Sequence, residues 1–283
     1  MQIAPLSDVL GAEVTGLDVN KLDDGTFNLV RDAFLKHYML VFRDQNLEVG
    51  SQADFSNRFG DLDVHIQKES AHPDRPEVQI LSNKKQDGKY VGSPVAGDNW
   101  HTDLQYTDLP TLCTLLYAVE TPQEGGDTEW ANMYLAYETL PEATKARLVG
   151  LKARHTFNRF RNKRVGVPKV YKGQGQKRYV DVSPPDSIHP VVRTHPETGR
   201  KALYVSERFT IGIEDLPEAE GEALLDELIA HQQQRQFVYR HKWRQHDLTM
   251  WDNRCLIHVA CGGVPPGQIR HMHRTIVRGD VPY

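Results

Sequence analysis

The run of residues 111–119 constrains the fold most strongly, because nearly every residue in it is apolar and favours β-structure. A strand of this composition is expected to be buried on both faces, so further layers of structure must lie on either side of it. Shorter strand-like runs occur at residues 39–42 and 78–81. The chain therefore has to build a layered β-structure around a central apolar strand.

Helices are expected before and between the strands. Asp23 and Asp24 can cap a helix in which Phe27, Val30 and Phe34 share one face. Ser51 is expected to open a second helix that ends near Gly60, and Pro141 interrupts a helical stretch over residues 133–151. A further helix is predicted over residues 217–233, where four large apolar residues share one face.

The second half of the chain contains most of the remaining strand signals. Residues 191–194 and 203–205 predict a β-hairpin around the turn at 197–199, and strands are expected at 237–243, 247–251 and 271–277. Many short strands with helices clustered early and between them predict a mainly β fold with flanking helices and a jelly-roll core. We expect residues 1–283 to form a single domain.

Composition excludes several classes of function. The formal net charge of -4 argues against a broad surface for nucleic acid or for an acidic membrane. No apolar run approaches the roughly 18 residues that span a bilayer, and no signal peptide is recognised at the N-terminus. The three cysteines form no C-x-x-C pair, which favours a reduced, cytoplasmic protein.

Residues 158–187 form the least regular part of the chain, with four basic residues followed by glycines and the pair Pro184-Pro185. A loop of this length inside a compact domain is usually functional or disordered. We interpret it as a lid over a site. A solvated insertion whose basic residues face water is the alternative, and the sequence leaves both open.

One motif combines a histidine and a carboxylate at strand spacing. His101 and Asp103 project to the same side of an extended chain, because side chains alternate with period 2. His258, far downstream, can complete a set of two histidines and one carboxylate, which is the donor set of non-haem Fe(II) oxygenases. Such a tripeptide also occurs by chance in a chain with 13 histidines, so the motif alone is a weak signal.

A basic strand near the C-terminus predicts an anion-binding cavity. If residues 270–274 are extended, Arg270, Met272 and Arg274 share one face, and His271 and His273 share the other. Two arginines that point into a barrel are too costly to bury without anionic partners, so a carboxylate-like ligand is expected. The alternative is a basic strand that faces solvent.

Further motifs occur in a characteristic order along nearly the whole chain. They are VFRDQ at 41–45, RFG at 58–60, NWHTD at 99–103, GGDT at 125–128, HPVVRTHP at 189–196, WDNR at 251–254 with His258, and HR at 273–274. Through them the sequence resembles the taurine dioxygenase and 2,4-dichlorophenoxyacetate dioxygenase family of Fe(II)/2-oxoglutarate oxygenases.

The resemblance implies a double-stranded β-helix in which His101, Asp103 and His258 bind Fe(II) and form the catalytic centre. It also implies that Arg270 binds the distal carboxylate of the cosubstrate 2-oxoglutarate, with a hydrogen bond from Thr128. The reaction of such enzymes consumes O2, releases succinate and CO2, and transfers a hydroxyl group to the substrate.

The primary substrate is expected to contact Arg274, His65 and Phe209, again by resemblance. Gly97 and Lys68 depart from the pattern of taurine-specific relatives, which argues against taurine itself. We expect a small organic carboxylate, a sulfonate or a sulfate ester, with C–heteroatom cleavage where hydroxylation falls beside the heteroatom. The alternative class is a jelly-roll protein that binds a small acid without turnover. Relatives of this kind suggest a homodimer or homotetramer.

Overall fold

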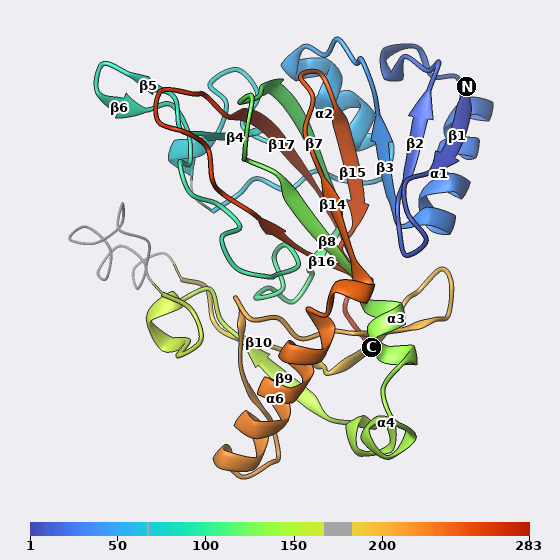
Figure 1. Ribbon diagram of the computed structural model, residues 1–283, viewed down its shortest axis with the longest axis vertical. Helices are drawn as coiled ribbons and strands as arrows, with labels where there is room; N and C mark the ends of the chain where they lie inside the picture. Colours follow the sequence, from blue (N-terminus) through green and yellow to red (C-terminus); the bar gives the residue numbers. More distant parts are fainter. Residues whose placement is uncertain (67, 167–182) are drawn as a thin grey trace.

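The computed structural model describes residues 1–66, 68–166 and 183–283, and is mainly β with helices along its edges (Figure 1). Its helices are α1 (Asp24–His37), α2 (Val49–Asn57), α3 (Met133–Glu138), α4 (Glu142–Leu148) and α6 (Glu218–Gln232), with short 3-10 turns at Val19–Lys21, Lys68–Ser70, Arg159–Arg161 and Arg235–Phe237.

Seven strands form the largest sheet, in the order β1-β2-β3-β15-β7-β17-β4. All neighbours in it are antiparallel except β2 and β3. Their bounds are β1 (Gln2–Pro5), β2 (Ala12–Thr15), β3 (Met39–Phe42), β4 (Gln79–Ser82), β7 (Thr111–Glu120), β15 (Leu248–Asp252) and β17 (His271–Arg278).

Smaller sheets complete the β-structure. One sheet, in the order β14-β8-β16, consists of β8 (Thr128–Asn132), β14 (Val238–His241) and β16 (Leu256–Ala260). The others contain β5 (Lys85–Gln86) with β6 (Lys89–Tyr90), β9 (Lys152–His155) with β10 (Ser187–Pro190) and β13 (Thr210–Ile213), and β11 (Val192–Thr194) with β12 (Lys201–Leu203).

The central strands of the large sheet are buried on both faces, as the sequence of β7 predicts. In β3, Met39 and Val41 join the core between the two main sheets, whereas Leu40 and Phe42 join a second core beneath α1 and α2. Strand β7 divides its side chains in the same alternating way. This period-2 division determines which residues can face the site, because only one face of each strand looks between the sheets.

The chain between the two main parts of the jelly roll forms the lower half of the view in Figure 1. It contains α3, α4, α6 and the strands β9 to β13. Apolar residues of α3 and α6 belong to the same core cluster as β8 and β16, so this half is packed continuously onto the inner core.

Several predicted elements are confirmed. Asp23 caps α1 by accepting a hydrogen bond from the backbone NH of Thr26, and the helical stretch 133–151 divides into α3 and α4 at Pro141. The hairpin pairs Val192 with Leu203, and the predicted helix over 217–233 is α6. The jelly-roll core is confirmed by the solved structure that is compared with this chain below.

Other predictions were wrong. Helix α2 begins at Val49 rather than Ser51, because Glu48 occupies the extended position before its first turn. The sequence analysis assigned no strands to β8, β9, β10, β13 or β16. The omission of β16 matters most, since this strand contains His258.

Of the predicted lid, residues 167–182 lie outside the described part of the chain. No helix in the described ranges is long and apolar enough to cross a bilayer.

Candidate metal centre

Three side chains that are far apart in the sequence converge at one point between the sheets. The side chains of His101, Asp103 and His258 each offer one ligand atom, and these atoms all lie within 4.8 Å of one another. The Nε2 atoms of His101 and His258 are each 3.7 Å from a carboxylate oxygen of Asp103. All three residues are buried. The structure thus brings together the three residues that the sequence analysis selected.

Backbone pairing explains how the distant histidines meet. The backbone NH of His101 donates to the carbonyl of His258 at 3.0 Å, and the NH of His258 donates back to His101 at 2.7 Å. This isolated β-bridge joins the loop before β7 to strand β16, and it holds the two imidazole rings with centroids 4.1 Å apart. Strand pairing therefore brings the two histidines together.

The orientation of the His101 ring suits a ligand. Its Nδ1 lies 2.8 Å from the carbonyl oxygen of Asn99, which can only accept, so Nδ1 carries the proton and Nε2 has the lone pair. A hydrogen bond of this kind usually fixes the tautomer of a metal-binding histidine. Nε2 points toward Asp103, where an ion would lie.

The charge states also suit a metal ion. Burial lowers the pKa of both His101 and His258, so both imidazoles are neutral near pH 7. Burial alone would raise the pKa of Asp103, but the positive charge of the nearby Arg274, helped by a hydrogen bond from Thr114, outweighs it and lowers that pKa, which keeps the carboxylate ionised. Metal ligands must be deprotonated in this way. Two neutral imidazoles and a carboxylate therefore fit a divalent first-row metal ion.

Arg274 lies beside this centre and is itself buried. Its Nη1 donates to Asp103 Oδ1 at 2.9 Å, and its other terminal nitrogen donates to Gln79 Oε1. Nε2 of Gln79 in turn lies 3.3 Å from Nδ1 of His65. Arg274 and His65 thus line the cavity next to the centre, as expected for substrate contacts, but the guanidinium of Arg274 is paired with the protein's own carboxylate.

An aromatic wall lines the same small cavity, whose volume is about 90 Å³. Phe209 lies edge-on to the ring of His101 with centroids 5.8 Å apart, and its centroid is 5.0 Å from that of Tyr106. Phe157 extends this wall, with its centroid 4.9 Å from that of Tyr106. The guanidinium carbon of Arg208 lies 4.5 Å from the Phe209 ring centroid. The cavity thus combines apolar surface with cationic groups.

Arg270 faces a second cavity, of about 270 Å³, which shares residues Ser93, Val95, Ala96 and Asp98 with the first. Its Nε donates to the carbonyl of Gly126 at 2.9 Å. Among the described residues, Arg270 forms no ion pair, and burial lowers its pKa to about 10, so it remains charged at pH 7. A cation that lacks a carboxylate partner in the described part of the chain and lies beside a cavity fits an anionic ligand.

Thr128 begins β8 near this second cavity but is not among the residues that line it. It pairs in register with Ala260, which lines the cavity, and its hydroxyl accepts a hydrogen bond of 3.0 Å from Nε1 of Trp243. Trp243 also lies under Arg270, with 5.8 Å between the guanidinium carbon and the ring centroid. Trp243 therefore contacts both residues that the resemblance assigned to 2-oxoglutarate.

His271 and His273 take the opposite face of β17, as the alternation predicted. The His273 ring packs against His271 and His72, with centroids 5.2 Å and 5.5 Å away. Met272 and Arg274 instead point between the sheets. The choice of Asp103 rather than these histidines for the metal set agrees with this geometry.

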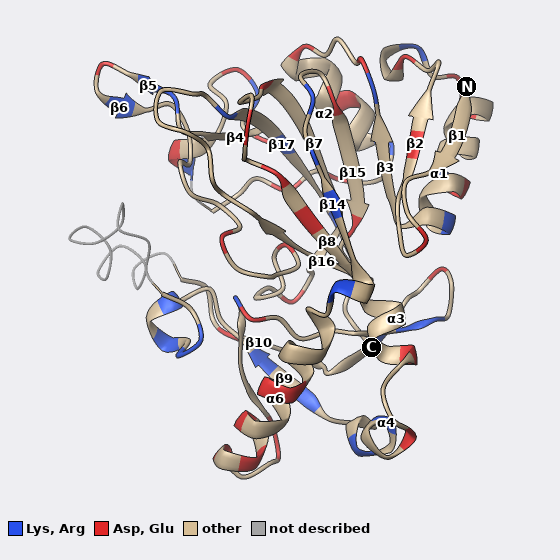
Figure 2. Ribbon diagram, viewed as in Figure 1, with Lys and Arg blue, Asp and Glu red and all other residues tan. Residues whose placement is uncertain are grey.

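The sequence analysis missed several residues around the cavities. Arg159 was assigned to a solvated or lid-forming basic stretch, but it is buried and forms an ion pair with Asp98 beside the metal centre. Its basic neighbours pair with acidic residues, several of them on α6, whose acidic positions are the red segments of that helix in Figure 2. Thr114 was hidden in the apolar run of β7, where its buried hydroxyl donates a hydrogen bond to Asp103.

A jelly-roll core with a buried site of two histidines and one carboxylate, open to adjoining cavities, defines a mononuclear non-haem metal oxygenase. Comparison with known proteins narrows this class. Residues 2–276 match the family model described as "Taurine catabolism dioxygenase TauD, TfdA family".

Individual relatives cover almost the whole chain. An (S)-phenoxypropionate/alpha-ketoglutarate-dioxygenase of Sphingobium herbicidovorans is 35% identical over 270 residues, which cover 91% of this chain and 88% of the relative. An alpha-ketoglutarate-dependent 2,4-dichlorophenoxyacetate dioxygenase of Cupriavidus pinatubonensis is 35% identical over 265 residues, or 90% of each chain. The crystal structure of AAD-2 in complex with Mn(II) and N-oxalylglycine matches with a TM-score of 0.81 and 31% identity, and 99% of each chain is covered.

The chain therefore belongs to the TauD/TfdA dioxygenase family. It is an oxidoreductase of the 2-oxoglutarate-dependent (alpha-ketoglutarate-dependent) dioxygenase type, and the catalytic interpretation is favoured over a small-acid-binding protein without turnover.

Proposed function

We propose that this enzyme uses Fe(II), 2-oxoglutarate and O2 to hydroxylate a small organic carboxylate, sulfonate or sulfate ester, with release of succinate and CO2. The observation that carries the proposal is the convergence of His101, Asp103 and His258, whose ligand atoms lie within 4.8 Å of one another. Two imidazoles and a carboxylate leave other coordination positions of an iron open.

The three side chains hold the metal, and they are the residues we expect to be essential for catalysis. When bound there, Fe(II) supplies the redox chemistry that couples oxidation of 2-oxoglutarate to oxidation of the substrate. The neutral imidazoles and the ionised Asp103 need no loss of protons before they bind the ion. The buried setting excludes water from the reacting groups.

Arg270 binds the distal carboxylate of 2-oxoglutarate in the 270 Å³ cavity, where no protein carboxylate pairs with it among the described residues. Thr128 accepts a hydrogen bond from Trp243, so its own hydroxyl proton is available for the same carboxylate. A charge-assisted contact of this kind contributes roughly 1.5–3 kcal/mol. It orients a small diacid whose other end reaches the metal.

Arg274, His65 and Phe209 bind the primary substrate in the smaller cavity. Arg274 supplies positive charge near the anionic group, and Phe209 with its aromatic neighbours supplies a surface for the apolar part. The named relatives act on phenoxypropionate and 2,4-dichlorophenoxyacetate, which combine an anionic group with an aromatic ring. These contacts support the same general chemistry here.

A panel of aryloxyalkanoates, alkanesulfonates and alkyl sulfates, supplied with Fe(II) and 2-oxoglutarate, tests the proposal. We expect oxygen uptake and succinate formation to rise together with one of these classes. His101→Ala should abolish both, while Thr249→Val, which removes a buried hydroxyl on β15 that bonds the Leu116 carbonyl, should not. Oxygen uptake that persists in His101→Ala would reject the assigned centre.

A homodimeric or homotetrameric state, a cytoplasmic location and a single-domain organisation stay predictions from the sequence. Size-exclusion chromatography with light scattering distinguishes a monomer from these oligomers directly.

A further inference from the structure

Asp103 is held by a hydrogen-bond relay that lies on the side away from the cavities. Its Oδ2 accepts a short hydrogen bond of 2.6 Å from the hydroxyl of Thr114 on β7. That hydroxyl accepts a hydrogen bond of 2.9 Å from Nδ2 of Asn253. Both partners are buried, so neither can exchange these contacts for bulk water.

Asn253 also holds the backbone at Asp103. Its Oδ1 accepts from the backbone NH of Asp103 at 3.0 Å, from the Thr102 hydroxyl at 3.1 Å and from Nε1 of Trp251 at 3.2 Å. The Thr102 hydroxyl lies 2.7 Å from the Asn253 carbonyl as well. The amide of one side chain therefore contacts both the main chain of Asp103 and the hydroxyl that binds its carboxylate.

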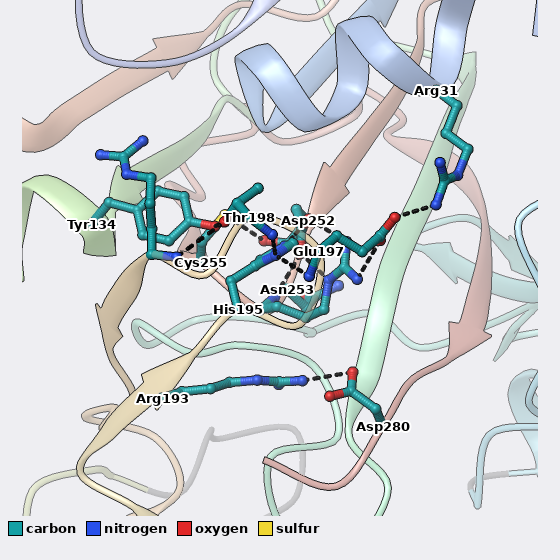
Figure 3. A network of polar contacts seen from close by, with 12 residues as sticks. Arg31, Tyr134, Arg193, His195, Glu197, Thr198, Asp252, Asn253, Cys255 and Asp280 are labelled. Atoms are coloured by element: carbon teal, nitrogen blue, oxygen red, sulfur yellow. Dashed lines mark hydrogen bonds and ion pairs between the residues drawn. The ribbon is translucent and has the colours of Figure 1, made fainter. Parts of the chain in front are cut away.

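An ionic network fixes Asn253 itself (Figure 3). Its neighbour Asp252 accepts two hydrogen bonds from the Arg254 side chain and one of 3.0 Å from Nε2 of His195. Nη1 of Arg254 also donates to Oε1 of Glu197 at 2.7 Å, and Glu197 forms an ion pair with Arg31 on α1. The buried turn that carries Asn253 is thus tied to the hairpin β11–β12 and to α1, which leaves its amide little freedom to reorient.

We propose that Asn253 is a positioning residue, which sets the direction of the Asp103 carboxylate toward the metal through Thr114 and through the Asp103 backbone. The inference rests on the metal centre proposed above. Without the relay, rotation about the Asp103 side chain would move Oδ2 away from the histidine nitrogens, because only Arg274 would still bind the carboxylate. Outer partners of metal ligands commonly change metal affinity or activity by about 10–100-fold.

A pair of substitutions at Thr114 tests the relay with little change in volume. Thr114→Val removes the hydroxyl and keeps the shape, whereas Thr114→Ser keeps the hydroxyl. Thr249→Val on the neighbouring strand β15 is the matched control, since it also removes a fully buried hydroxyl from the same sheet. Asn253→Ala removes both routes at once and serves as a second variant.

The measurement is a Co(II) titration of the full chain after its metal has been removed by chelation, followed by visible absorption, with thermal unfolding as a check of folding. We expect Thr114→Val to weaken Co(II) binding about 10–100-fold and to alter the Co(II) bands. Thr114→Ser and Thr249→Val should resemble the wild type. Asn253→Ala should weaken binding at least as much as Thr114→Val.

Wild-type affinity and bands in Thr114→Val would overturn the inference, as would an equal loss in Thr249→Val. A wild-type protein that binds Co(II) but forms no succinate with Fe(II) would instead contradict the proposed activity, and the relay would still be judged by affinity. A wild type that binds no Co(II) would overturn both.

Discussion

Arg270, just before β17, and Arg274, within that strand, occupy contrasting surroundings, although only four positions separate them. Arg274 is buried against Asp103, so the protein itself supplies its counter-charge. Arg270 faces a cavity of about 270 Å³ and has no carboxylate partner among the described residues. The first arginine is part of a preformed charge pair, and the second is open to a ligand.

Arg270 and Arg274 therefore have different roles, although the sequence presents the two arginines as equivalent. Removal of one partner of a buried ion pair leaves an uncompensated charge and is costly to stability. Removal of an arginine that has no carboxylate partner relieves a desolvation cost and chiefly affects the ligand. Stability and ligand affinity should therefore respond in opposite ways at the two positions.

Arg274→Met should have the largest effect on stability. Loss of its charge leaves Asp103 buried without its cation, which should destabilise the metal-free protein by about 3 kcal/mol. A bound divalent metal replaces that charge, so the loss should shrink in the metal-loaded protein. Urea unfolding with and without Co(II) measures both values. Arg278→Met, at the exposed end of the same strand, is the control. Equal losses of stability with and without Co(II) would contradict the role of Arg274 as the counter-charge of Asp103.

Arg270→Met should act almost entirely on 2-oxoglutarate. We expect the KM for 2-oxoglutarate to rise roughly 10–100-fold, which corresponds to the 1.5–3 kcal/mol of a charge-assisted hydrogen bond. The urea midpoint of the ligand-free protein should stay the same or rise, in contrast with Arg274→Met. Steady-state kinetics with each reactant varied in turn measures the effect, with the exposed Arg240→Met as control. If the primary substrate were affected more strongly, the two arginines would have exchanged roles.

His273, on the outer face of β17, should make the stability of the folded protein depend on pH. Burial, together with the charges of His271 and His72, lowers the pKa of His273 from 6.5 to about 4. The folded protein binds this proton more weakly than the unfolded chain, so stability present above pH 6.5 is lost as the pH falls toward 4. Between pH 7 and pH 5 the contribution should be on the order of 1 kcal/mol.

His273→Gln should make urea unfolding less sensitive to pH over this window. Co(II) affinity measured at pH 7 should not change, because the ring faces away from the metal centre. An unchanged pH dependence would assign the acid sensitivity to other groups.

Phe209→Leu should have the smallest effect. Loss of its ring contacts with His101 and Tyr106 removes about 0.5–1.5 kcal/mol, so the KM for the primary substrate should rise a few-fold. The KM for 2-oxoglutarate should not change. Phe59→Leu, in the aromatic cluster beneath α1 and α2, is the matched control. A larger rise in the KM for 2-oxoglutarate than in that for the primary substrate would assign Phe209 to the other cavity.

The sequence by itself determined the elements whose patterns are local. The apolar run of β7, the capped helix α1 and the hairpin β11–β12 were predictable because periodicity and capping depend on neighbouring residues. The alternation around Met272 also separated the arginine face from the histidine face correctly. The donor set of His101, Asp103 and His258 was found from residue type and order, with help from the family resemblance.

Tertiary structure alone decided which of these charges are already compensated. Whether Arg274 meets Asp103, Arg159 meets Asp98, or Thr114 meets Asn253 depends on the pairing of strands and loops that are remote in sequence. Even the meeting of His101 with His258 depends on a backbone bridge whose second partner, β16, carried no recognised strand signal. Local patterns set the face on which a side chain lies, but the partner that determines its energy comes from the packing of distant segments.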